Sequence, residues 1–179
     1  MQKALQIPSV TLDGLIVVKH GGRSVSSQCG SADVAEALHI PLCQSTQDVQ
    51  DQLRRAPFAF LLAGYFNAVP PHVITLRRQL GIRTCFNVLS PLLNPVALSH
   101  QVMGVYDPVF LDQVPALMEE TGVKSGMVLH SQDGMDEISI SAPTDIAYMG
   151  KWGVRRFTLT PESVGLTSPE RSHCGKRTS

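Results

Sequence analysis

The chain has 179 residues, of which 43% are hydrophobic and 17% charged, and its fifteen basic residues balance fifteen acidic ones. A chain of this length and composition is typical of a globular protein and suits one domain with a substantial core. The neutral balance, without any block of lysines and arginines, argues against nucleic-acid binding and against attachment to an anionic membrane. No apolar run approaches the ~20 residues that cross a bilayer.

The four cysteines form no CxxC pair, and their spacings match no zinc pattern. The chain also shows no signal peptide. We therefore expect reduced thiols and a cytoplasmic protein.

Residues 1–14 give only a weak secondary-structure signal, and the first clear elements follow them. A β-branched run at 15–18 predicts a strand, and the pattern at 32–38 predicts a helix. Between them, the stretch 19–33 reads KHGGRSVSSQCGSAD, with two cations, glycines and hydroxyls. Strand, glycine-rich loop and helix is an arrangement by which α/β proteins bind phosphate through backbone N–H groups. An ordinary polar connection is the alternative, and the clustered cations and hydroxyls favour the anion site.

The next elements continue an α/β pattern. Ser45 is a predicted N-cap for a helix that runs to residue 55, and residues 58–62 form an apolar run typical of a buried strand. Residues 70–80 predict a helix with proline in its first turn and Gly81 beyond its end.

Further strands are predicted at 101–105 and 127–130, on either side of a helix at 108–120. Alternation at 138–141 and at 156–159 predicts two more strands or a hairpin. The serine-rich, basic tail 167–179 has no apolar periodicity, so we expect it to be disordered.

Four blocks of this sequence resemble anthranilate phosphoribosyltransferases, enzymes of tryptophan biosynthesis. They are KHGGRSVSSQCGSAD at 19–33, LRRQLGIRTCFNVLSPLLNP at 76–95, MGVYDP at 103–108 and HSQDGMDEIS at 130–139. The resemblance covers about three-quarters of the chain and fades near residue 166. It implies the α/β core of the nucleoside phosphorylase and phosphoribosyltransferase catalytic domain, with a mostly parallel sheet flanked by helices.

The resemblance also implies a reaction, a glycosyltransfer. Anthranilate attacks the anomeric carbon of phosphoribosyl pyrophosphate and displaces pyrophosphate, with Mg²⁺ as cofactor and without a covalent enzyme intermediate. Such an enzyme positions its two substrates and neutralises the leaving group, and no side chain is expected to act as a catalytic acid or base. Small-molecule substrates, rather than nucleic acid or a membrane, are the partners this implies.

Three sets of residues match the family's binding sites. The phosphoribosyl pyrophosphate set is Lys19, His20, Gly21, Gly22, Arg23, Ser24, Val25, Ser26, Ser27 and Ser31. Arg77 matches an arginine that faces the anthranilate carboxylate, and Asp136 with Glu137 matches the magnesium-binding pair. From the residues alone, Arg77 fits a solvated helix face and the acidic pair fits a solvated turn. Asn87 and Asn94 are expected to satisfy backbone groups.

The chain departs from the family pattern at two positions near the acceptor. Gly22 stands where the family has an asparagine whose side chain touches anthranilate, and Asn67-Ala68 replaces a His-Pro pair. Complete family members are about twice as long and dimerise through an N-terminal helical domain, which has no counterpart here. We therefore expect a fragment in which residues 1–14 are atypical, 15–166 form a partial α/β domain and 167–179 form a tail. We also expect impaired activity.

The sequence leaves more than one interpretation open. The chain is a phosphoribosyltransferase core, or it is a non-catalytic remnant that binds phosphate or a partner. A pyrimidine nucleoside phosphorylase shares the general fold, but its loop carries a different sequence.

Overall fold

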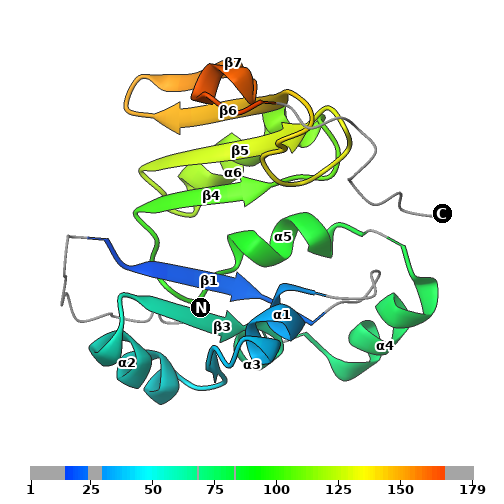
Figure 1. Cartoon of the computed structure of the whole chain (residues 1–179). Coiled ribbons are helices and arrows are strands. Elements are labelled where there is room, and N and C mark those ends of the chain that lie inside the picture. Colours follow the sequence, from blue (N-terminus) through cyan, green and yellow to red (C-terminus); the bar gives the residue numbers. More distant parts are fainter. Residues whose placement is uncertain (1–14, 24–29, 68, 83, 168–179) are drawn as a thin grey trace. The chain divides into compact units, whose positions relative to one another are not determined.

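The computed structural model describes residues 15–23, 30–67, 69–82 and 84–167. They form two compact units that divide between Ala97 and Leu98, each with its own sheet and packed helices (Figure 1). The α/β fold class is thus confirmed, with one parallel and one mixed sheet. That 15–166 behave as one domain stays a prediction. The predicted atypical segment 1–14 and the tail beyond Thr167 lie outside the described residues.

The first unit is built on a three-stranded parallel sheet of order β1-β3-β2. Its strands are β1 (Val17–Gly21), β2 (Leu42–Cys43) and β3 (Phe58–Leu62). The central strand β3 matches the predicted bounds, and its apolar run is buried from Ala59 to Leu62 because neighbouring strands and helices cover it.

Two helices connect these strands and bury their apolar faces. Helix α1 (Ser31–Ala37) packs Ala32 and Ala35 against Phe60 and Leu62 of β3. Helix α2 (Thr46–Arg55) begins as predicted: the Ser45 hydroxyl accepts a hydrogen bond from the Asp48 backbone N–H at 3.2 Å, and the Asp48 carboxylate accepts one from the Ser45 N–H.

Three short helices complete the first unit. They are α3 (Ala63–Phe66), α4 (Pro71–Leu80) and α5 (Phe86–Leu92). Helix α4 ends as predicted at Gly81, which has a φ of 61°, a conformation that glycine adopts without a steric penalty. Leu76 and Leu80 of α4 are each about half exposed, so the apolar side chains of this helix are only partly covered.

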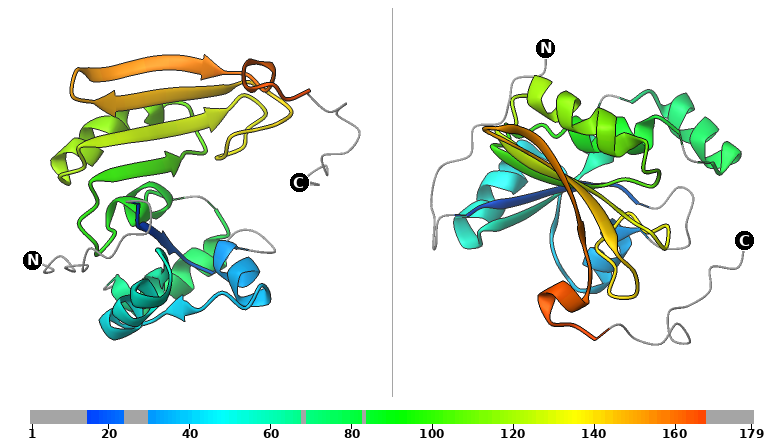
Figure 2. Two further views of the ribbon diagram at one scale, coloured as in Figure 1. Left: turned by 60° about the vertical axis from the view of Figure 1, so that its left-hand side comes forward. Right: turned by 90° about the horizontal axis from the view of Figure 1, so that it is seen from above.

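The second unit holds a four-stranded sheet of order β4-β5-β6-β7. Strands β4 (His100–Gly104) and β5 (Ser125–Ser131) are parallel and are joined through helix α6 (Phe110–Glu120). Strands β6 (Thr144–Gly150) and β7 (Gly153–Leu159) add an antiparallel hairpin, followed by the short helix η1 (Glu162–Val164). Helix α6 covers one face of this sheet through Leu111, Val114 and Met118 (Figure 2).

The prediction of a strand at 138–141 is wrong. That stretch belongs to an irregular connection, and β7 pairs instead with β6, which the alternation did not reveal. The reason is local: the Ser139 N–H donates to the Thr144 hydroxyl, and the Ser141 N–H donates to the Ser139 hydroxyl. Side chains thus take backbone groups that a strand would need for its ladder.

None of the helices in the described ranges is both long and apolar enough to span a membrane.

Candidate substrate-binding site

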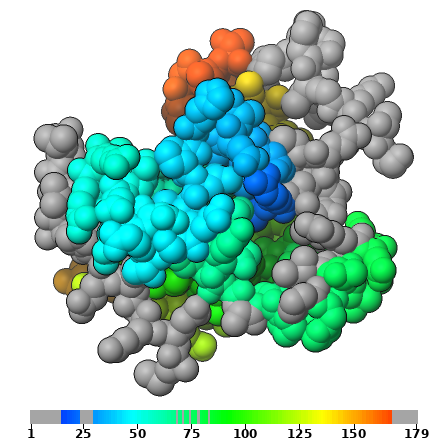
Figure 3. Space-filling view, turned by 90° about the horizontal axis from the view of Figure 1, so that it is seen from below, coloured from blue at the N-terminus to red at the C-terminus, as the bar shows by residue number. Residues whose placement is uncertain are grey.

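The predicted phosphate-binding residues lie at the carboxyl end of β1. Lys19, His20 and Gly21 were predicted in a loop, but they belong to the strand because they pair in parallel with Phe60, Leu61 and Leu62 of β3. Gly22 and Arg23 follow the strand, and the dark-blue surface of the segment that ends at residue 23 lies beside the lighter blue of α1 (Figure 3). Ser24, Val25, Ser26 and Ser27 lie outside the described residues.

Gly21 brings the end of β1 close to the start of α1. A Cβ atom built on Gly21 would lie 3.2 Å from the Ser31 hydroxyl oxygen and 3.2 Å from Cζ of Phe60. A Cβ atom on Gly22 would meet no atom within 4 Å. Gly21 is therefore needed for close packing, whereas Gly22 borders open space. Two of the predicted residues, Gly21 and Ser31, are thus neighbours.

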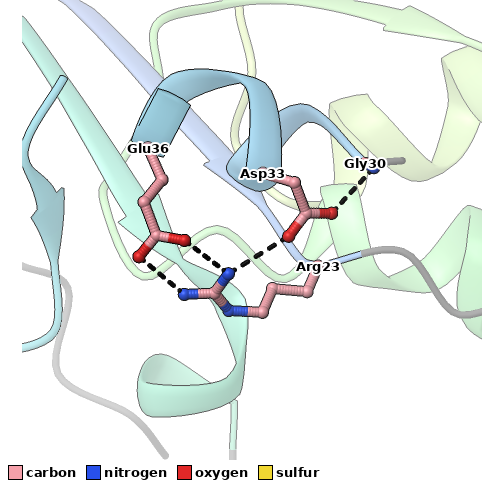
Figure 4. Close-up of polar contacts among 4 residues, drawn as sticks. All are labelled: Arg23, Gly30, Asp33 and Glu36. Carbon is pink, nitrogen blue, oxygen red and sulfur yellow. Dashed lines mark hydrogen bonds and ion pairs between the residues drawn. The ribbon is translucent and has the colours of Figure 1, made fainter. Parts of the chain in front are cut away.

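Arg23 points back onto α1 (Figure 4). Its Nη1 donates to Glu36 Oε2 at 2.7 Å and its Nη2 to Glu36 Oε1 at 3.0 Å, a two-pronged contact; Nη1 also lies 3.1 Å from Asp33 Oδ1. The other oxygen of Asp33 accepts the Gly30 backbone N–H at 2.8 Å. The cation predicted to contact phosphate is therefore paired with two carboxylates in this structure.

These contacts shift the proton affinities of both partners. The hydrogen bonds that Arg23 donates to Glu36 raise the pKa of Arg23 further above its usual value, and the same bonds lower the pKa of Glu36. Sequence analysis missed Asp33 and Glu36 as partners of Arg23. Asp33 and Glu36 are three residues apart on the predicted helix and therefore share one face. This spacing could have predicted that both contact the same cation.

His20 differs from a typical loop histidine. Its Nε2 is buried, and no hydrogen-bond partner for it is found among the residues that the structure describes. Burial lowers the pKa of His20, although a hydrogen bond to the Ser90 backbone opposes that effect. His20 therefore joins the end of β1 to α5, rather than facing solvent.

Arg77 is partly exposed, and its side chain contacts neighbouring residues. Its guanidinium stands 5.1 Å from the centre of the Phe86 ring, and its Nη2 donates to Asn87 Oδ1 at 3.4 Å. The Nε of Arg77 and the hydroxyl of Thr84 are buried without a partner among the described residues. A buried donor left unpaired is costly, so this position favours a ligand that supplies an acceptor.

The predicted structural role of two asparagines is confirmed. Asn87 Oδ1 accepts the Thr84 backbone N–H at 2.9 Å, and Asn94 Oδ1 accepts the Val96 backbone N–H at 3.0 Å. Asn67, one of the residues that depart from the family pattern, donates to the Ser90 hydroxyl at 3.3 Å.

Asp136 and Glu137 lie in the second unit, on the connection between β5 and β6. Both are exposed, and neither makes a hydrogen bond or an ion pair with another described residue. No group of three or more histidine, cysteine or acidic side chains that could hold a metal occurs in the described part of the chain. The pair can therefore offer two hard oxygen donors, but not a closed metal cage.

The sequence of the chain matches a known protein family. The model of the glycosyl transferase family, α/β domain, matches residues 8–177. The chain belongs to this family. It is also homologous to anthranilate phosphoribosyltransferases: it is 40% identical to the enzyme of Petrotoga mobilis and 43% identical to that of Moorella thermoacetica, over 153 residues in each case. Those alignments cover 86% of this chain but only 44% and 45% of the two relatives.

Solved structures agree with this assignment. The anthranilate phosphoribosyltransferase of Thermus thermophilus superposes with a TM-score of 0.75 at 38% identity, over 88% of this chain and 46% of that one. The Saccharomyces cerevisiae enzyme in complex with PRPP and Mg gives a TM-score of 0.74 at 31% identity, over 92% and 45%. The chain therefore spans less than half the length of these relatives.

Proposed function

We propose that this chain carries the donor-binding part of an anthranilate phosphoribosyltransferase, which moves phosphoribosyl from phosphoribosyl pyrophosphate to anthranilate and releases pyrophosphate. The observation that carries the proposal is the 40% identity to such enzymes over 86% of the chain. The glycine-rich end of β1 beside α1 supports it, because open space at Gly22 and the cations Lys19 and Arg23 suit a pyrophosphorylated sugar.

The role of the donor site is to bind and orient. The backbone at Gly22 has open space beside it, and Lys19 is exposed on the same strand end, so both can approach phosphate oxygens. Glu36 and Asp33 occupy Nη1 and Nη2 of Arg23, so a phosphate oxygen has to compete with these two carboxylates for the same N–H groups.

The carboxylate oxygens of Asp136 and Glu137 are suitable ligands for Mg²⁺. Mg²⁺ is bound through one or two carboxylates plus water and substrate phosphates, and these two carboxylates are exposed and unpaired among the described residues. When bound, the metal neutralises charge on the departing pyrophosphate. The side chains of Asp136 and Glu137 would hold the metal.

Arg77 is the proposed anchor for anthranilate. Its buried Nε lacks an acceptor among the described residues, which is what a planar carboxylate would supply. Gly22 offers no side chain for the amide contact implied by the family pattern, so we expect weak acceptor binding. In the transfer, the anthranilate amine attacks the anomeric carbon, the bond to pyrophosphate breaks, and the amine passes its proton to solvent.

Titration calorimetry tests this function in two steps. Phosphoribosyl pyrophosphate with Mg²⁺ should bind saturably at one site, and anthranilate should then bind only to the loaded chain. Arg77→Gln should abolish the second step and leave the first unchanged. Absence of any donor binding would contradict the proposal.

A second function is a non-catalytic phosphate-binding remnant. Gly22 and the pairing of Arg23 with Glu36 favour it, because both weaken the substrate contacts of a working enzyme. Donor binding without acceptor binding or phosphoribosyl-anthranilate formation would assign the chain to this second function.

A further inference from the structure

The connection from β5 to β6, residues 132–143, folds back over the sheet onto strand β4. At Gly104 the two backbones are in close contact: a Cβ atom there would overlap the Asp136 carbonyl oxygen and lie 2.6 Å from its carbonyl carbon. The φ of Gly104 is not in the left-handed region, so the strand itself does not require glycine. The requirement comes from the neighbouring Asp136 backbone.

This contact lies on the face of the sheet opposite α6. Gly104 pairs with Leu129, whereas Gly126, three residues before Leu129 on β5, points to the other face. A Cβ atom on Gly126 would lie 2.9 Å from the sulfur of Met118 in α6. The two glycines thus make close contacts on opposite faces of one sheet, with different elements.

The connection is also braced internally. The Ser139 hydroxyl donates to Asp133 Oδ2 at 2.6 Å, the Ser139 N–H donates to the Thr144 hydroxyl at 3.2 Å, and the Ser131 N–H donates to the Met135 carbonyl at 2.9 Å. Asp133 is thus engaged by the loop itself. Asp136 and Glu137 are the carboxylates left exposed at its surface.

We propose that Gly104 is a positioning residue for the Asp136–Glu137 pair: the missing side chain lets the Asp136 carbonyl rest on β4, and this contact sets where the two carboxylates point. The inference rests on the metal role proposed above. A side chain at Gly104 pushes the Asp136 backbone away from the sheet, and ligand geometry must hold within about 0.5 Å for productive binding.

The test uses the full chain, labelled with ¹⁵N, and Mn²⁺ alone as a paramagnetic probe of the metal site. In the parent chain, the amide signals of residues 134–139 should broaden at low Mn²⁺, and Asp136→Asn with Glu137→Gln should remove that broadening. Gly104→Ala should need about tenfold more Mn²⁺ for the same broadening, as for the loss of a metal-orienting contact. Gly126→Ala is the matched control. It strains the same sheet, but its amide signals should broaden at the same Mn²⁺ concentration as those of the parent chain.

Amide hydrogen exchange provides the second readout. Gly104→Ala should accelerate exchange in residues 132–143, and Gly126→Ala should not. If Gly104→Ala leaves both exchange and broadening unchanged, or if Gly126→Ala has the same effects, the positioning role is overturned. If the parent chain shows no selective broadening, both the metal role and this inference are overturned, while calorimetric donor binding still decides the proposed function separately.

Discussion

At Gly22 the backbone has room for a side chain, because a Cβ atom there meets nothing within 4 Å and its φ is not positive. Glycine is therefore not a requirement of the backbone at this position. The resemblance places an asparagine here, in contact with anthranilate, so in the proposed function its absence weakens acceptor binding.

Gly22→Asn should leave the thermal unfolding midpoint unchanged and tighten anthranilate binding to the donor-loaded chain about fivefold, the value of one hydrogen bond of about 1 kcal/mol. Calorimetry measures the affinity. Gly64→Asn is the control, since Gly64 on α3 also borders open space. Unchanged anthranilate affinity in Gly22→Asn would show that this position does not face the acceptor.

His20 predicts how stability depends on pH. Burial lowers its pKa in the folded chain below the ordinary 6.5, so on acidification the unfolded chain takes up the proton first. The His20 contribution to stability is therefore full above about pH 6.5 and is lost as the pH falls below it.

Replacement of His20 should flatten this dependence. Urea midpoints measured at about pH 7.5 and about pH 5.5 should differ less in His20→Gln than in the parent chain, and His72→Gln, at an exposed position on α4, should behave like the parent. An equal acid-induced drop in His20→Gln would mean that His20 does not titrate in a buried site.

At the scale of elements, the contact between the end of β1 and helix α1 carries the main functional question. Arg23 joins the two through Glu36 and Asp33, and all three side chains are solvent-accessible. Exposed ion pairs contribute little to stability. In the proposed donor site, this pairing would compete with a phosphate for the same guanidinium.

Glu36→Gln should relieve that competition. We expect donor affinity in calorimetry to rise severalfold, with no measurable change in the urea midpoint. Asp51→Asn is the matched control, because Asp51 pairs with Arg54 within α2 and is similarly exposed. Weaker donor binding in Glu36→Gln would instead mean that Glu36 orients Arg23 toward the donor.

Local sequence signals predicted most elements well. Capping at Ser45, the apolar run of β3 and the terminal Gly81 depend on neighbouring residues, and all three were predicted. One contact distant in sequence was not predictable: the extension of β1 through Gly21 depends on pairing with β3. Strand β6 was missed although it adjoins β7 in a hairpin closed at Gly150 and Gly153. The ion pairs of Arg23 were missed because a cation in a glycine-rich loop fits a phosphate ligand equally well.

At the scale of the whole molecule, the described residues form two units, each with its own buried core. The donor residues lie in the first and the acidic pair in the second. The aligned region is under half of each relative. Catalysis by this chain is therefore a proposal, and it depends on the residues that the chain shares with those relatives.

In the proposed function, the end of β1 binds a pyrophosphorylated sugar. Chemical-shift mapping of the ¹⁵N-labelled chain with phosphoribosyl pyrophosphate and Mg²⁺ tests this binding. Saturable shifts should be largest at the amides of Gly21, Gly22, Arg23 and Ser31. Shifts confined to other segments, or none at saturating donor, would contradict it.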